Sequence, residues 1–166
     1  MFCPWWLDRL GNRANRGARH AGGNSAGIYG GGVLAGAATV TITNSTFLTN
    51  SADNNGGGIL NLASGTLSVK STILTDNTIS SGDTPENCGG TITDIGYNIS
   101  DDDSCDFTLE TSANNLNPRP DPDGLKDNGG PTETIALEPG SPALDAIPLD
   151  DCTDQASPPK RLTRRS

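Results

Sequence analysis

The chain reads Asn24-Ser25-Ala26, which returns as Asn50-Ser51-Ala52 and then as Asp76-Asn77-Thr78, a constant step of 26 in residue number. Two more motifs keep this step, Gly30-Gly31-Gly32-Val33-Leu34 returning as Gly56-Gly57-Gly58-Ile59-Leu60 and Ser45-Thr46-Phe47-Leu48-Thr49 returning as Ser71-Thr72-Ile73-Leu74-Thr75. A fixed period of about 20 to 50 residues is the signature of a stacked repeat. The sequence therefore predicts a short solenoid.

The residues between these motifs alternate as strands do. Apolar side chains take every second place in Val40-Thr41-Ile42-Thr43 and in Leu67-Ser68-Val69-Lys70, and a period of two indicates a β-strand. The 21 glycines and 11 prolines argue against helices. We therefore expect an all-β fold, a parallel β-helix of about three coils with an irregular C-terminal cap. A β-sandwich is the alternative, but it would not require a fixed step.

In a parallel β-helix each strand lies on its copy one coil away, and this predicts specific contacts. Phe47 is expected over Ile73, and Asn50 is expected near Asp76 or Asn77, where stacked amides hydrogen-bond in a ladder. Eight apolar side chains are predicted to point inward: Val40, Ile42, Phe47, Leu67, Val69, Ile73, Ile92 and Ile95.

The distribution of charged residues distinguishes the central part of the chain, which we call the body, from its two ends. The formal net charge is -9, and the acidic residues concentrate in the body, which is expected to repel nucleic acid. No run approaches the ~20 apolar residues of a membrane span, so no transmembrane segment is expected. We interpret residues 1–23 as a disordered or non-native leader, 24–126 as the coils, 127–155 as the C-terminal cap and 156–166 as a disordered basic tail.

The four cysteines are Cys3, Cys88, Cys105 and Cys152. Cys88 and Cys105 flank one predicted coil, and a disulfide between them would close that loop in an oxidising compartment. Four cysteines allow three connectivities, among which the sequence alone does not choose. We predict the Cys88–Cys105 bridge, with two free buried thiols as the alternative.

From Cys88 onward the repeat gives way to distinct motifs. They are Cys88-Gly89-Gly90-Thr91-Ile92 with Gly96-Tyr97-Asn98, then Asp127-Asn128-Gly129-Gly130-Pro131-Thr132, then Pro139-Gly140-Ser141-Pro142-Ala143-Leu144-Asp145-Ala146. With the Gly-rich repeats and Phe47-x-x-Asn50, they resemble right-handed β-helix surface proteins of bacteria, in particular the choice-of-anchor Q type. The repeats alone also resemble polymorphic outer-membrane proteins.

The resemblance covers residues 24–155 and implies a right-handed coil, an extracellular or cell-surface location and an adhesin-like role. After Gln155, members of the family continue with Arg-Gly, whereas this chain continues with Ala156-Ser157-Pro158-Pro159. We therefore interpret the chain as the C-terminal fragment of a larger surface protein, with foreign or frame-shifted ends.

Few side chains suit catalysis. His20 is the only histidine, and because it lies in the predicted leader we expect no Ser-His-Asp or Cys-His arrangement in the body. Calcium is the one candidate cofactor, because carboxylates on flexible loops are its usual ligands. The candidate ligands are Asp101, Asp102, Asp103 and Asp106, with Asp121, Asp123 and Asp127 as a second group.

These observations favour a non-catalytic secreted or surface-displayed β-helix protein with a structural or adhesive role. Its partner would be an extracellular polysaccharide or a host or neighbour surface. A polysaccharide lyase or glycoside hydrolase on the same scaffold is one alternative, and a carbohydrate- or calcium-binding module is another. Since a coil without a neighbour exposes strand edges, self-association through the uncapped N-terminal coil is also expected.

Overall fold

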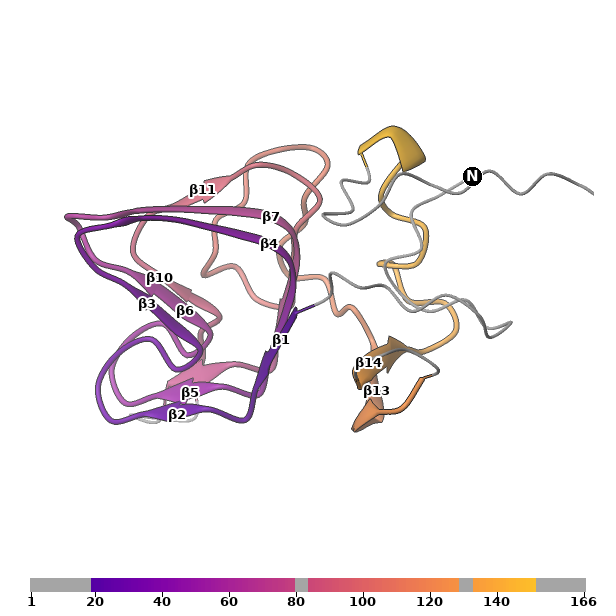
Figure 1. The fold of residues 1–166 in the computed structure, drawn as a ribbon, viewed down its shortest axis with the longest axis horizontal. Helices are drawn as coiled ribbons and strands as arrows, with labels where there is room; N and C mark the ends of the chain where they lie inside the picture. Colours follow the sequence, from indigo (N-terminus) through magenta and orange to yellow (C-terminus); the bar gives the residue numbers. More distant parts are fainter. Residues whose placement is uncertain (1–18, 80–83, 129–132, 152–166) are drawn as a thin grey trace, which may run out of the picture.

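The computed structural model describes residues 19–79, 84–128 and 133–151, which form an all-β structure with no α-helix in these ranges (Figure 1). The predicted fold class is confirmed at this level. The strands are β1 Arg19–Gly22, β2 Ser25–Ala26, β3 Val33–Ala35, β4 Thr39–Leu48, β5 Ser51–Ala52, β6 Ile59–Asn61, β7 Thr66–Thr75, β8 Thr78–Ile79, β9 Thr84–Pro85, β10 Cys88–Gly89, β11 Ile92–Asp94, β12 Ile99–Ser100, β13 Pro120–Lys126 and β14 Thr134–Leu137. A 3₁₀ turn, η1, spans Leu149–Asp151.

Strands that are distant in sequence pair in three parallel sheets. These sheets are β2-β5-β8, to which β9 adds antiparallel, β3-β6-β10, and β1-β4-β7-β11, in which β12 also pairs with β7. Successive strands enter the sheets in rotation, and we call one passage through all three a circuit. Strands of neighbouring circuits pair Val33 with Ile59 and Thr39 with Thr66, offsets of 26 and 27 in residue number. The sequence step is therefore the offset between paired strands.

The register between β4 and β7 differs by one residue from the alignment of the Ser-Thr motifs. Both strands bend at a residue with positive φ, Asn44 at 54° and Ser71 at 51°. Because these bends lie over each other, Phe47 pairs with Leu74, and Ile73 pairs with Thr46. The predicted stacking of Phe47 over Ile73 is therefore wrong.

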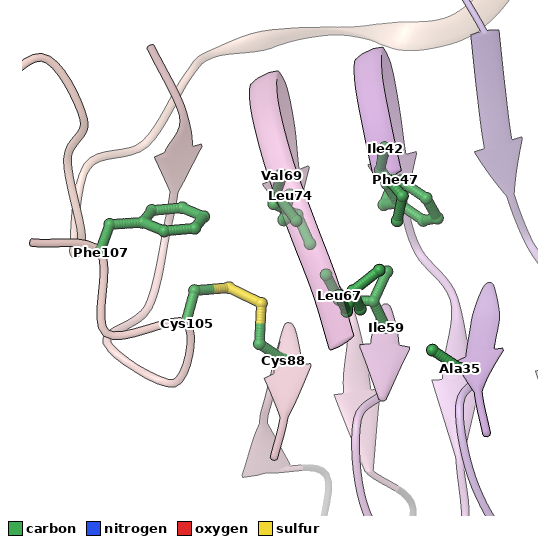
Figure 2. Packing of buried hydrophobic residues seen from close by; sticks show 10 residues of the cluster. All are labelled: Ala35, Ile42, Phe47, Ile59, Leu67, Val69, Leu74, Cys88, Cys105 and Phe107. Carbon is green, nitrogen blue, oxygen red and sulfur yellow. A yellow bond between two sulfur atoms is a disulfide. The ribbon is translucent and has the colours of Figure 1, made fainter. Parts of the chain in front are cut away.

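The inner core is a row of side chains enclosed by the circuits (Figure 2). Its buried members are Ala35, Ile42, Phe47, Ile59, Leu67, Val69, Leu74, Cys88, Cys105 and Phe107. Val40 and Ile92 pack against this row and are partly buried. Ile95, predicted to point inward, is 43% exposed, because β11 ends at Asp94 and the alternation stops there.

A second apolar cluster lies on the outer face of the sheet. Ile73 packs there with Ile99 and Ala143, and Leu116 and Leu137 cover them. Ile73 is therefore buried, as predicted, but outside the inner core. Figure 1 accordingly shows β13 and β14 beside the bent ends of β4 and β7.

Two predicted boundaries also change. β1 pairs in parallel with β4, so residues 19–22 belong to the sheets and not to a leader. β13, predicted as part of the coils, pairs antiparallel with β14, because Pro120 and Pro122 lack the amide donors that a central parallel strand needs. Residues 1–18, 80–83, 129–132 and 152–166 lie outside the described residues, as do Cys3, Cys152 and the predicted basic tail.

The repeated glycines allow the circuits to approach each other closely. A Cβ atom on Gly57 would lie 2.3 Å from the carbonyl oxygen of Thr78, and one on Gly31 would lie 2.2 Å from that of Gly57. Both distances are shorter than any real contact, so each glycine is needed at its position.

Candidate functional site

Four asparagines form a continuous hydrogen-bonded ladder across the circuits. The side-chain amide of Asn24 donates to Asn50 Oδ1 at 2.8 Å, that of Asn50 to Asn77 Oδ1 at 2.8 Å, and that of Asn77 to Asn87 Oδ1 at 2.7 Å. The amides of Asn50, Asn77 and Asn87 also donate to main-chain carbonyls of the preceding circuit, as Asn77 does to Phe47 at 3.0 Å. The predicted contact between Asn50 and Asn77 is confirmed.

Carboxylates complete the ladder at its C-terminal end. The amide of Asn87 donates to Asp101 Oδ1 at 2.7 Å and to Ser100 Oγ at 2.8 Å, and the Asn87 backbone N–H donates to Asp102 Oδ2 at 2.8 Å. Asp102 also accepts from the hydroxyls of Ser100 and Ser104. These carboxylates therefore take the place that the next asparagine would occupy.

The four residues predicted as calcium ligands have two different surroundings. Asp101 and Asp102 are partly or fully buried and accept hydrogen bonds from the chain, including one from Thr75 Oγ1 to Asp101 Oδ2 at 2.8 Å. Asp103 and Asp106 are exposed. Within the described residues, no three Asp, Glu, His or Cys side chains gather as a metal site. Calcium binding by this loop stays a prediction.

A disulfide joins Cys88 to Cys105, as predicted, at a sequence separation of 17. Both cysteines are buried, and Phe107 lies beyond them at the end of the inner row (Figure 2). Sequence reasoning missed Phe107, which packs with the disulfide against the last circuit. The segment around Cys105 and Phe107 therefore closes the C-terminal end of the inner row. The predicted cap from residue 127 onward does not.

Asp94 holds the segment after Asp106 to the last circuit. Its carboxylate accepts from the backbone N–H groups of Leu109 and Gly96, at 2.9 Å and 2.8 Å, and from the side chains of Ser112 and Asn98, both at 2.8 Å. Partial burial by itself raises the pKa of Asp94, but these hydrogen bonds outweigh it and bring the pKa below its ordinary value of 3.8.

Asp76 and Asp101 are neighbouring carboxylates, since the charge of Asp101 affects the pKa of Asp76. Partial burial and then the negative charge of Asp101 raise the pKa of Asp76, while a hydrogen bond from Thr75 opposes the rise. The backbone N–H of Asp76 donates to Asp101 Oδ2 at 2.9 Å. Both oxygens of Asp101 accept hydrogen bonds from the chain. The carboxylate of Asp101 therefore stabilises the fold.

His20, expected outside the folded body, lies in β1 and lines a cavity of about 540 Å³ with Ser45. Burial lowers its pKa, which favours the neutral imidazole. Ser45 Oγ donates to the Thr43 carbonyl at 2.8 Å, and no carboxylate is among the described residues that line the cavity. The serine and histidine share a cavity without the geometry of a nucleophile and its base.

A lyase on this scaffold would need a basic residue as its proton acceptor, and Lys70, Arg119 and Lys126 lie on β7 or in and beside β13. Lys126 donates to Asp121 at 3.0 Å and to Asp123 at 2.6 Å, and Arg119 pairs with Glu138 at 3.3 Å. Lys70 lies on β7, where it pairs with Thr43 of β4. None of the three lines the cavity beside His20.

Comparison of the chain with known proteins found no matching family model, no matching curated protein and no matching solved structure. The resemblance to choice-of-anchor surface proteins thus stays a prediction from motifs. Within the described ranges, no helix has the length and apolar character needed to cross a membrane.

Proposed function

We propose that the three parallel sheets are the faces of a right-handed parallel β-helix, and that the chain is a non-catalytic scaffold of a secreted or surface-displayed protein. The rotation of successive strands through the sheets supports the coil, as does the nearly constant offset between paired strands. The right-handed sense of the coil and the relation to choice-of-anchor Q proteins are inferred from the motifs between residues 24 and 155.

The hydrogen bonds that the carboxylates accept from the chain are the observation that supports a structural role. Asp94, Asp101 and Asp102 lie in or directly after the last circuit, and each accepts several hydrogen bonds from the backbone and side chains around it. A catalytic acid needs an oxygen directed at the substrate, whereas these oxygens are directed at the chain. The Cys88–Cys105 disulfide supports an oxidising compartment, as expected for an extracellular or cell-surface protein.

Adhesion is tested by binding of the purified protein to a panel of acidic and neutral polysaccharides and to intact cells. We expect the protein to bind at least one of these polysaccharides or cell surfaces. If it bound none of them, the adhesive role would be refuted. The same polysaccharides, incubated with and without calcium, are monitored for unsaturated products by ultraviolet absorbance. Product formation would establish the lyase alternative and refute the non-catalytic one.

Calcium binding and self-association need separate measurements. Calorimetric titration with calcium tests the loop of Asp101, Asp102, Asp103 and Asp106, for which saturable binding lost in Asp103→Asn would support a site. Light scattering over a range of protein concentrations tests self-association, for which a monomer at the highest concentration would refute the prediction.

A further inference from the structure

Asn55 is followed directly by Gly56, and an Asn-Gly pair can react within its own chain. Asparagine is a thermolabile residue, because the backbone nitrogen that follows it attacks its side-chain carbonyl carbon and closes a succinimide ring. Glycine at the second place has no side chain to hinder the attack. The sequence holds two such pairs, Asn55-Gly56 and Asn128-Gly129, and the structure describes both residues of the first.

The fold requires the glycine of this pair but not the asparagine. Gly56 has a φ of 65°, and a Cβ atom on it would lie 2.6 Å from the carbonyl oxygen of Ile59. In the preceding circuit, the residue that forms a parallel bridge with Asn55 is Tyr29, so the coil accepts a very different side chain at this place. The reactive pair therefore arises because this chain has asparagine before a glycine that the coil needs.

The side chain of Asn55 lacks the hydrogen bonds that hold the ladder asparagines. Its Oδ1 is buried and has no hydrogen-bond partner among the described residues. The same oxygen lies against Gly89, where an added Cβ atom would be only 1.6 Å away. In the ladder, by contrast, the amide of Asn50 donates to Oδ1 of Asn77 at 2.8 Å. The Asn55 carbonyl therefore gives up no such hydrogen bond when it turns toward the Gly56 nitrogen.

Glu86 holds the attacking nitrogen. The Gly56 N–H donates to Glu86 Oε1 at 2.7 Å, and a hydrogen bond to a carboxylate is stronger than one between neutral groups. The main chain fixes Glu86 in this position, since its N–H donates to the Asn77 carbonyl at 3.0 Å and its carbonyl accepts from Gly57 at 2.9 Å. Because the nitrogen must move out of this bond to reach the Asn55 carbonyl carbon, Glu86 opposes ring closure.

We propose that Asn55 is a self-modification site, which converts to aspartate or isoaspartate at a rate that Glu86 controls. In the first step the Gly56 nitrogen bonds to the Asn55 side-chain carbonyl carbon and gives up its proton. The bond from that carbon to Nδ2 breaks, and ammonia leaves. In the second step a water molecule opens the ring at either carbonyl carbon, which yields aspartate or isoaspartate without any oxidant or reductant.

The product is expected to weaken the contacts of the second circuit with its neighbours. A carboxylate on residue 55 places a negative charge against Gly89 and near the carboxylate of Glu86, and like charges disfavour each other. Isoaspartate also lengthens the main chain by one carbon and turns the Asn55 main-chain carbonyl, which accepts from Gly30 at 3.1 Å, into a free carboxylate. Conversion therefore loosens the coil as the protein ages, whether or not the protein is an adhesin.

Incubation of the folded protein at physiological temperature and pH tests the site. Peptide mapping by mass spectrometry measures conversion at residue 55, and an isoaspartyl methyltransferase assay detects isoaspartate. Glu86→Ala should convert at least about tenfold faster than the parent, because the hydrogen bond of Gly56 to a charged acceptor is lost. Glu86→Gln keeps an acceptor oxygen and should convert more slowly than Glu86→Ala. The converted fraction, separated by anion exchange, should have a lower urea midpoint than the unconverted protein.

The controls separate a local effect from a general loss of stability. Ile73→Ala removes a side chain of the outer cluster and leaves Glu86 in place, so it should not accelerate conversion as Glu86→Ala does. Asn128 is an internal control, because its amide donates to Thr134 and its rate should be the same in the parent and in both Glu86 variants. Circular dichroism confirms that each variant folds, and the parent in urea gives the rate of the unfolded chain.

Four results would overturn the proposal. Slower conversion in both Glu86 variants would make Glu86 a base that drives the reaction instead of a group that restrains it. Equal acceleration by Glu86→Gln or by Ile73→Ala would remove the specific role of the carboxylate. The other two results are no conversion at residue 55 in folded Glu86→Ala while the parent in urea converts, and an unchanged urea midpoint of the converted fraction.

Discussion

Truncation of Asn77 to alanine tests the idea that the asparagine ladder holds the circuits together. Asn77 is 1% exposed and sits between two other ladder residues. Its Oδ1 accepts from the backbone and side chain of Asn50, at 2.9 Å and 2.8 Å, and its amide donates to Phe47 and Asn87. Alanine removes all four hydrogen bonds at once.

The cost follows from the groups that lose a partner. The Asn50 N–H and the Phe47 carbonyl are in buried residues, and an unsatisfied buried polar group costs about 1 to 3 kcal/mol. Asn87 Oδ1 is also buried and keeps only the hydrogen bond of 3.4 Å from the Asn77 backbone N–H. Two unsatisfied groups give about 2 to 6 kcal/mol. Since a domain of this kind is stable by about 5 to 15 kcal/mol, Asn77→Ala should remove a large part of the free energy of unfolding.

Urea denaturation followed by far-ultraviolet circular dichroism measures the effect. Asn24→Ala is the matched control, because Asn24 is the exposed first member of the ladder and its loss should cost about 1 kcal/mol or less. If the midpoints of Asn77→Ala and Asn24→Ala agreed, the ladder would contribute no more at its centre than at its exposed end, and the reasoning would be refuted.

The other predictions concern the disulfide, the close contacts, the register and Asp94. Cys88→Ser should lower the free energy of unfolding by about 3 kcal/mol, and an unchanged urea midpoint would contradict this. Gly57→Ala should destabilise, because its Cβ meets the Thr78 carbonyl; a midpoint equal to the parent's would show that the circuits can separate. Ile73→Ala should cost about 2 to 5 kcal/mol and Ile95→Ala about 0.5 kcal/mol or less, and a similar large cost for both would support the inward position predicted for Ile95. Since the folded pKa of Asp94 lies below its ordinary value, its contribution is present above about pH 4 and is lost as pH falls; urea midpoints of the parent and Asp94→Asn should therefore converge in acid, and a constant difference would exclude this role.

Features that repeat along the chain could be predicted well. The recurrence of Asn24, Asn50 and Asn77 at nearly constant spacing indicated both the parallel pairing and the amide ladder. The pairing of Cys88 with Cys105 was also predicted, because the two residues flank one coil. In each case, position along the repeat translates directly into position in space.

Features that depend on a single residue of register could not be predicted. Aligning Ser71 with Ser45 placed Ile73 beneath Phe47, whereas the stacked bends at Asn44 and Ser71 shift the pairing by one residue. Because side chains alternate between the faces of a strand, that shift moves Ile73 to the opposite face.

The candidate site was harder to predict than the fold. Asp101 and Asp102 were interpreted as calcium ligands from their sequence alone, but the structure places them against Asn87, where they complete the ladder. The signal that could have suggested this was the position of Asp101, which lies 26 residues after Thr75 and accepts the hydrogen bond from its hydroxyl. For His20 a signal was also present, since it lies one repeat step before Thr46, its partner in β4.

The sequence by itself determined the all-β class, the parallel offset and the inward position of Ile42, Phe47, Leu67 and Val69, because these follow from local alternation and from a period that every circuit must share. Only the tertiary structure decided which apolar cluster holds Ile73 and that Phe107 closes the inner row. These depend on contacts between segments that share no repeat. Such contacts are selected by the space and the hydrogen-bonding groups that remain once the circuits have stacked.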